Sequence, residues 1–356
     1  MQNQQIILIH GKNYKQMTKQ LLQAAGLADE IGSRDTPVAL KPNLVIGAPA
    51  SRGATTHPEL VAGVLEYLQE NGFRDLRVIE GSWVGSRTSE AVQTSGLLDV
   101  CRQYRVPFID LQKDASASYD AKGMQIKVCN EAMRPGFLIN MPVLKGHGQT
   151  LITCALKNAK GLIPNSEKRR FHALGLHAPI AHLNALIHWE FILVDNICGD
   201  LDFEEGGNPV EMDRIFACKD PVLCDSFVCR TMGYQPQDVP YIPMAEALGV
   251  GSTDLSAATI TALNEPAQAI TDQRPSRRVQ ALMQPAAPAT GLCCTRSTSW
   301  RRTMAARPLT IRSASGRITA GRPAVSASAA ARRALPAVSR AARPPPRRSM
   351  TFCWRI

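Results

Sequence analysis

The sequence predicts an α/β fold, with a mainly parallel sheet that carries helices on both faces, followed by a disordered basic tail. Two observations support this prediction. Short apolar segments alternate with helical segments along residues 1–265, which is the pattern of repeated strand–helix units. From residue 273 to residue 356, by contrast, the sequence contains 17 Arg and no Lys, Asp or Glu. We therefore predict a folded domain over residues 1–265 and a tail over residues 266–356.

Strands are expected wherever a short apolar segment rich in β-branched residues occurs. These segments are residues 5–10, 38–45, 76–80, 106–111, 124–129, 137–141, 191–195, 212–218 and 258–263. The segments 124–129 and 137–141 are expected to pair with each other.

Helices are expected between these strands. They are predicted up to about residue 25, over 58–71, near 89–104, near 151–160, near 180–188 and over 221–232. Pro58 suits the first turn of its helix, and Gly72 follows the predicted end.

Polar residues end several of the predicted strands. The residues in question are Lys41, Glu80, Asp110, Asn140 and Asp195. Because ligands of open α/β sheets collect beyond the carboxyl ends of the strands, these positions predict a shared cleft. The alternative for any one of them is ordinary loop polarity.

The segment from Asn140 to Gly161 is the densest polar part of the chain. Lys145 and His147 lie on a turn flanked by Gly146 and Gly148, where the backbone is expected to approach a ligand closely. Lysine side chains and exposed amides near a helix start would suit an anion. The alternative is an ordinary strand–turn–helix corner.

Three other charged or metal-ligating groups receive weaker interpretations. The triplet 168–170 is expected to be a solvated basic face. His172, His177, His182 and His188 are spaced too widely to share one helical face, which argues against a zinc site. The acidic loop around Glu204 and Glu205 favours a solvated turn, with a metal site as the alternative. Asp195 is the better candidate for a base or a metal ligand.

Charge and cysteine usage exclude several classes of protein. Residues 1–272 contain 24 Lys and Arg against 30 Asp and Glu, a net charge of −6, so the basic balance of the chain lies in the tail. We therefore predict no nucleic-acid partner. No apolar segment reaches 18 residues and no secretory signal is visible, so we also predict no membrane partner. The seven cysteines before residue 230 lack CxxC spacing and are expected to be free thiols of a cytoplasmic protein.

Several motifs in this order resemble the domain-of-unknown-function family 362. They are KPNLV at 41–45, THPEL at 56–60, EGS at 80–82, NMPVLKGHG at 140–148, ALKNAKG at 155–161, VDNICG at 194–199 and KDPVLCDSF at 219–227. The resemblance covers about residues 5–265. Members are often described as iron–sulfur proteins, so it implies a [4Fe–4S] cluster in intact relatives, bound by a cysteine-bearing C-terminal region.

The printed tail lacks that region and is typical of DNA read in a shifted frame. In the shifted frame, Met350-Thr351 must encode Asp, and both Phe352-Cys353 and Cys353-Trp354 must encode Leu. The same shift permits several cysteines at cluster-like spacing. We therefore predict a frameshift that begins near residues 265–283, and no cluster bound by the chain as printed.

Together these observations predict redox or metal-dependent chemistry on an anionic small molecule, with a redox protein as a further partner. The predicted catalytic residues are His147, Glu80 and Asp195. The predicted ligand-binding residues are Lys41, Asn43, Asn140, Lys145, Lys157 and Asn158. No metal ligand is assigned. The alternative is a non-catalytic protein that carries or assembles a metal or cluster.

Overall fold

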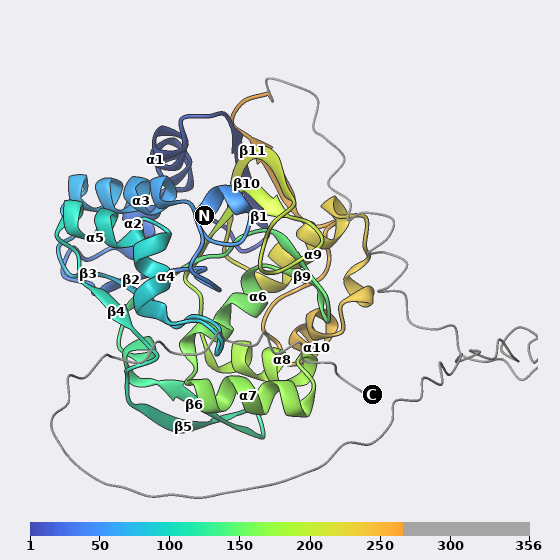
Figure 1. Ribbon diagram of the computed structural model, residues 1–356. Coiled ribbons are helices and arrows are strands. Elements are labelled where there is room, and N and C mark those ends of the chain that lie inside the picture. The colour runs from blue at the N-terminus through green and yellow to red at the C-terminus, as the bar shows by residue number, and fades with distance from the viewer. Residues whose placement is uncertain (266–356) are drawn as a thin grey trace, which may run out of the picture. The chain divides into compact units, whose positions relative to one another are not determined.

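The computed structural model describes residues 1–265, and the tail predicted over residues 266–356 lies outside the described residues (Figure 1). A central sheet has the strand order β12-β1-β11-β10-β7-β2-β3-β4. Its strands are β1 (Gln5–His10), β2 (Val38–Pro42), β3 (Leu76–Glu80), β4 (Phe108–Asp110), β7 (Phe137–Met141), β10 (Phe191–Asp200), β11 (Pro209–Cys218) and β12 (Thr259–Ala262). Only β11 runs antiparallel to its neighbours, β1 and β10. The prediction of a mainly parallel sheet is confirmed.

Helices cover both faces of the sheet, as predicted (Figure 1). One face carries α1 (Tyr14–Ala25), α2 (Leu27–Ile31), α3 (Pro58–Glu70), α4 (Thr88–Thr94) and α5 (Leu97–Tyr104). The opposite face carries α6 (Ala155–Asn158), α7 (Asn165–Leu174), α8 (His177–Leu186), α9 (Pro221–Thr231) and α10 (Tyr241–Ala247). Short 3-10 helices are η1 (Ala50–Arg52), η2 (Asn130–Met133), η3 (Ala159–Leu162) and η4 (Pro236–Asp238). None of the helices in residues 1–265 combines the length and the apolar character that a membrane span requires.

Two small antiparallel ribbons lie outside the central sheet. They are formed by β5 (Ser116–Ala121) with β6 (Met124–Cys129), and by β8 (Lys145–His147) with β9 (Leu151–Thr153). The predicted pairing of 124–129 with 137–141 is wrong. Lys122 and Gly123 both have positive φ, so they form a tight hairpin turn that pairs β6 with β5. Strand β7 lies instead between β2 and β10.

Several other elements differ from prediction. Gly96, with φ of 81°, divides the helix predicted near 89–104 into α4 and α5. The helix predicted near 151–160 begins as strand β9. Helix α7 was not predicted. Strand β10 continues to Asp200, so Asp195 does not end a strand.

Side-chain alternation decides which face each polar strand residue reaches. In β2, Val38 and Leu40 pack with the helices of the α1–α5 face, so Lys41 points to the α6 face. In β10, Phe191 and Leu193 pack on the α1–α5 face, and Asp195 follows them with the same parity. Lys41 and Asp195 therefore project from opposite faces of the sheet.

Candidate functional site

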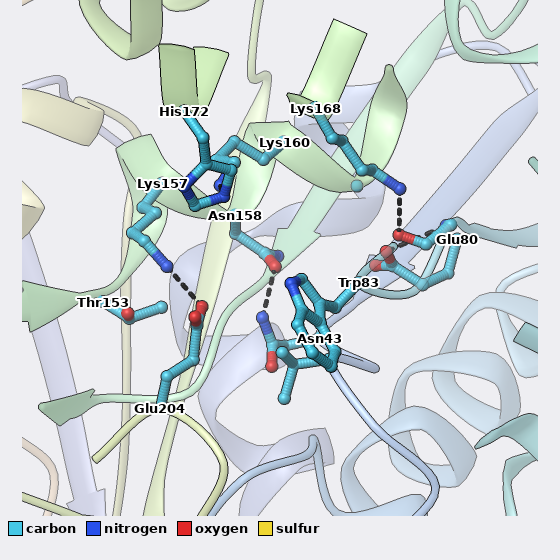
Figure 2. Close-up of a pocket in the computed structure, with 13 residues that line it drawn as sticks. Asn43, Glu80, Trp83, Thr153, Lys157, Asn158, Lys160, Lys168, His172 and Glu204 are labelled. Carbon is cyan, nitrogen blue, oxygen red and sulfur yellow. Dashed lines mark hydrogen bonds and ion pairs between the residues drawn. The ribbon is translucent and has the colours of Figure 1, made fainter. Parts of the chain in front are cut away.

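A polar pocket lies beyond the carboxyl ends of β2 and β3, between them and the segment that contains α6, η3 and α7 (Figure 2). Its cavity volume is about 50 Å³, enough for a few water molecules or one small ligand group. The lining residues are Asn43, Val45, Glu80, Gly81, Trp83, Thr153, Lys157, Asn158, Lys160, Gly161, Lys168, His172 and Glu204.

The floor of the pocket is a buried ion pair between Lys41 and Glu80. Lys41 Nζ also donates to Asn158 Oδ1 at 3.0 Å, and the Gly81 amide donates to Glu80 Oε1 at 2.9 Å. Burial is the largest influence on both groups: it lowers the pKa of Lys41 and raises the pKa of Glu80, while their mutual attraction opposes both shifts. Gly161 packs directly against this pair, where a Cβ would clash with Glu80 Oε1 and Lys41 Nζ.

Three asparagines connect the ion pair to a second buried lysine. Asn158 accepts from Asn43 Nδ2 at 2.8 Å and donates to Asn140 Oδ1 at 2.8 Å. Lys145 Nζ donates to Asn43 Oδ1 at 2.9 Å. The structure thus brings together six predicted residues: Lys41, Asn43, Glu80, Asn140, Lys145 and Asn158. Lys145 is fully buried, however, so the expectation that it lies on an open turn is wrong.

A second ion pair joins Lys157 on α6 to Glu204 on the loop between β10 and β11 (Figure 2). His147 Nε2 lies 3.0 Å from the other Glu204 oxygen, and His147 Nδ1 accepts from the amides of Gln149 and Thr150. Burial, followed by the Lys157 charge, lowers the pKa of His147 to about 4, so the ring is neutral near pH 7 and donates through Nε2. Burial disfavours the ionised form of Glu204, but Lys157, His147 and Lys145 together hold its pKa well below the usual range.

Two further lysines line the pocket, Lys160 from η3 and Lys168 from α7. Lys168 Nζ donates to the carbonyls of Gly81 and Ser82, both at 2.8 Å, and burial lowers its pKa to about 8. Lys160 Nζ lies 3.3 Å from His172 Nε2. Burial and the adjacent Lys157 charge lower the pKa of Lys160 to about 7.

The charges in and around the pocket do not balance. Five lysines (41, 145, 157, 160 and 168) share two carboxylates, those of Glu80 and Glu204. Within residues 1–265, no carboxylate lies within 4.0 Å of the ammonium groups of Lys145, Lys160 or Lys168. Buried charge without an opposite charge beside it is costly, so this arrangement favours an anion.

One buried hydroxyl group at the pocket also lacks a partner. Thr153 Oγ1 makes no hydrogen bond to any of the described residues, although the side chain is almost fully buried. Thr153 lines the pocket on the side of Lys157 and Glu204 (Figure 2). Because buried polar groups are normally satisfied, this hydroxyl is available to a bound ligand.

Asp195 does not line this pocket, contrary to the predicted shared cleft. Its Oδ2 accepts from the His57 amide at 2.7 Å and lies 2.9 Å from His57 Nδ1, at the start of α3. Burial lowers the pKa of His57, but the Asp195 charge outweighs it, so the net pKa is raised. Asp195 is outside the pocket because it points to the α1–α5 face of the sheet, whereas Lys41 points to the α6 face.

The expectation that Gly146 lets the backbone approach a ligand is also wrong. A Cβ on Gly146 would clash with the Leu201 carbonyl, so this glycine permits contact with the β10–β11 loop and not with a ligand.

Several residues that line the pocket were not among the predicted site residues, and three of them are the charged side chains of Glu204, Lys168 and Lys160. Glu204 was expected on a solvated turn and Lys168 on a solvated face, yet Lys168 is buried and Glu204 is paired. Lys168 shares the inner face of α7 with Phe171, and this spacing of three was the available signal. Lys160 was part of the dense polar segment but received no role.

The described residues do not fit a four-thiolate cluster. Within residues 1–265, one group has metal-ligand spacing, formed by Cys154, Cys224 and Asp225, all buried. It offers two thiols, and the Asp225 carboxylate already accepts from the amides of Ala155 and Leu156. Burial raises the pKa of Cys154 to about 11, which opposes the thiolate form.

The profile of the family described as "Domain of unknown function (DUF362)" matches residues 38–230, a range that contains every lining residue of the pocket. The chain belongs to this family. All the motifs on which the sequence resemblance rested lie within this DUF362 region. A protein of Synechocystis sp. named as thylakoid-associated is 26% identical to this DUF362 chain over 247 residues, 66% of the chain and 74% of that relative.

Proposed function

We propose that this DUF362 protein binds a small anionic molecule in the lysine-lined pocket and acts on it as an enzyme. The observation that carries the proposal is the excess of lysine over carboxylate around a cavity of about 50 Å³. The partnerless hydroxyl of Thr153 supports it, because it offers a hydrogen bond in addition to charge. A cavity of this size suits one carboxylate or phosphate group of a small ligand.

The chain's own residues would divide the work as follows. Lys168 and Lys157 would bind the anion at its charged group, and the Asn43–Asn158–Asn140 network would hold α6 in place. His147 would orient Glu204 through Nε2–H, since its other ring nitrogen is occupied by two amides. Glu204 and Glu80 would accept or supply protons at the ligand.

The test is ligand-induced stabilisation of the full chain. Inorganic phosphate and pyruvate should raise the midpoint of thermal unfolding, whereas glycerol, which is neutral, should not. At about 100 times the dissociation constant, binding stabilises the folded state by about 2.7 kcal/mol. Lys168→Met, which keeps the apolar stem and removes the charge, should weaken anion binding about tenfold or more, as expected for a desolvated charge contact.

The matched control is Lys113→Met, because Lys113 is an exposed lysine outside the pocket. An equal response to phosphate in all three proteins, or no response to either anion, would contradict the proposal.

The finer prediction of iron–sulfur chemistry depends on the shifted reading of the tail. The seven free thiols of the described domain support a reducing, cytoplasmic location, as predicted. Resequencing the gene across codons 260–300 tests the frameshift, and anaerobic reconstitution of a frame-corrected protein tests the cluster and its redox partner. A clean sequence in the printed frame would remove the cluster from the proposal.

A further inference from the structure

Three lysines line the pocket, and their surroundings differ in one chemical respect. The Lys157 ammonium is paired with Glu204. Lys168 donates to two backbone carbonyls, which hold its protons in place. The partner of Lys160 is a nitrogen, Nε2 of His172, at 3.3 Å. Only an amine that can lose its proton is a nucleophile, so the partner of each lysine bears on its chemistry.

The contact between Lys160 and His172 needs at least one unprotonated nitrogen, because two protonated groups would repel each other. Burial and the charges of Lys160 and Lys157 lower the pKa of His172 to about 4, so its ring is neutral near pH 7 and Nε2 can accept a proton from Lys160. Burial and the charges of Lys157 and Lys168 lower the pKa of Lys160 to about 7 against the attraction of Glu204, so part of its amine is neutral near pH 7. Among residues 1–265, no carboxylate oxygen lies within 4.0 Å of Lys160 Nζ, so no ion pair stabilises its ammonium form.

His172 is placed to move protons between Lys160 and solvent. It is on α7, its side chain is exposed, and it lines the same pocket (Figure 2). Figure 2 shows its ring beside Lys160, at the opposite end of the pocket from Asn43. An imidazole in this position can accept a proton from the amine and return it to a departing oxygen.

We propose that Lys160 is a nucleophile that forms an imine with a carbonyl group of the anionic ligand, so the substrate class is a small oxo acid or a phosphorylated aldehyde or ketone. The inference rests on the anion-binding function proposed above. The neighbouring lysines 157 and 168 and the hydroxyl of Thr153 would hold the charged group while the carbonyl carbon faces Lys160 Nζ.

The step balances without an oxidant or reductant. The Nζ lone pair forms a C–N bond with the carbonyl carbon, and the carbonyl π electrons move to oxygen. His172 accepts one proton from the nitrogen and delivers it to that oxygen, which becomes a hydroxyl group. The nitrogen lone pair then completes the C=N bond as the C–O bond breaks, and His172 passes the remaining Nζ proton to the departing hydroxide, which leaves as water. The two hydrogens of the amine leave with the oxygen.

Borohydride trapping of the full chain tests this assignment. With pyruvate and sodium borohydride, peptide mass spectrometry should find the reduced adduct on Lys160, and trypsin should no longer cleave after that residue. Acetone, which is a ketone without the carboxylate, should label Lys160 at least about tenfold less at the same concentration, because it lacks the charged contact.

Three variants sharpen the result. Lys160→Arg keeps a positive charge but has no nucleophilic amine near neutral pH, so it should lose the adduct. His172→Gln should slow trapping by about tenfold or more if His172 carries the proton. Lys113→Arg, which changes an exposed lysine outside the pocket, should label Lys160 at the native rate.

The outcomes separate this inference from the proposed function. If pyruvate raises the unfolding midpoint of the native protein but no adduct forms at Lys160, anion binding stands and the nucleophile assignment is overturned. Equal labelling of exposed lysines and Lys160, or labelling at Lys157 or Lys168 in its place, would also overturn it. If neither the midpoint nor the lysines respond, both proposals fail.

Discussion

The ion pair between Lys41 and Glu80 sets the stability of the pocket floor, since both side chains are almost fully excluded from solvent. Lys41→Met leaves the Glu80 carboxylate buried beside a methyl group, and Glu80→Gln leaves the Lys41 ammonium with amide partners alone. Each change should lower the free energy of unfolding by about 3–5 kcal/mol. The double variant should recover much of that loss, because no uncompensated charge remains. Urea unfolding of the four proteins measures the coupling, and additive losses would contradict a direct pair.

Gly161 provides a second prediction at the scale of one residue. Gly161→Ala places a methyl group against Glu80 Oε1 and Lys41 Nζ, and these atoms cannot move freely because Gly81 and Asn158 hold them. The variant should lose about 1–3 kcal/mol of stability through overpacking and should bind phosphate less tightly. Gly148→Ala is the control, since its Cβ would have nothing within 4 Å. Equal unfolding curves for the two variants would refute the predicted clash.

At the scale of elements, one carboxylate links the helices on the α6 face to the pocket. Asp225, buried on α9, accepts from the amides of Ala155 and Leu156 at the start of α6. Asp225→Ala leaves both amides without that partner and should cost about 1–3 kcal/mol. Because α6 carries Lys157 and Asn158, the same variant should also weaken phosphate binding.

The N-cap of α9 offers the matched control for this prediction. Asp220 accepts from the amides of Val222 and Leu223, and does not line the lysine pocket. Asp220→Ala should lower stability by about 1 kcal/mol and leave phosphate affinity unchanged. Calorimetric titration of both variants separates the two effects, and equal affinities would show that Asp225 does not position α6.

A site residue could be predicted from the sequence where strand order alone fixes its position. It could not be predicted where contacts with residues far away in the sequence fix that position. Lys41, Glu80 and Asn140 end strands of one parallel sheet, so their meeting follows from strand order alone. Glu204 does not follow from local pattern. Its loop is shaped by Asp200, which accepts from the amides of Asp202, Phe203 and Asn208, and by the approach of Leu201 to Gly146.

Asp195 was misplaced for a similar reason. The length of β10 decides whether Asp195 ends the strand, and that length comes from pairing with β11 as far as Pro209. The face to which it points then follows from alternation along that strand. Both are properties of tertiary pairing, so an apolar segment read in isolation could not supply them.

At the scale of the whole molecule, the pocket lysines link stability and ligand binding to pH in opposite directions. Folding lowers the pKa of Lys145 and Lys160 to about 7 and that of Lys168 to about 8. The unfolded chain, in which lysine titrates near 10.5, therefore binds more protons above pH 7, and these groups make the free energy of unfolding rise with pH. Anion binding needs the ammonium forms, so phosphate affinity should fall by about tenfold or more between pH 6.5 and 8.5, as the lysines lose their protons.

Comparison of the native protein with Lys160→Met isolates this effect from other groups. His57, whose pKa is raised, loses its stabilising contribution as pH rises, and the buried thiols act in the same sense above about pH 8.5. Those contributions are common to both proteins and cancel in the difference. From pH 7 to 8.5 the native protein should therefore gain stability over the variant by at most about 1.4 kcal/mol per pH unit. Urea unfolding across this window provides the measurement. A difference that does not change with pH across this window would mean that Lys160 stays protonated in the folded protein, which would also remove it as a nucleophile near neutral pH.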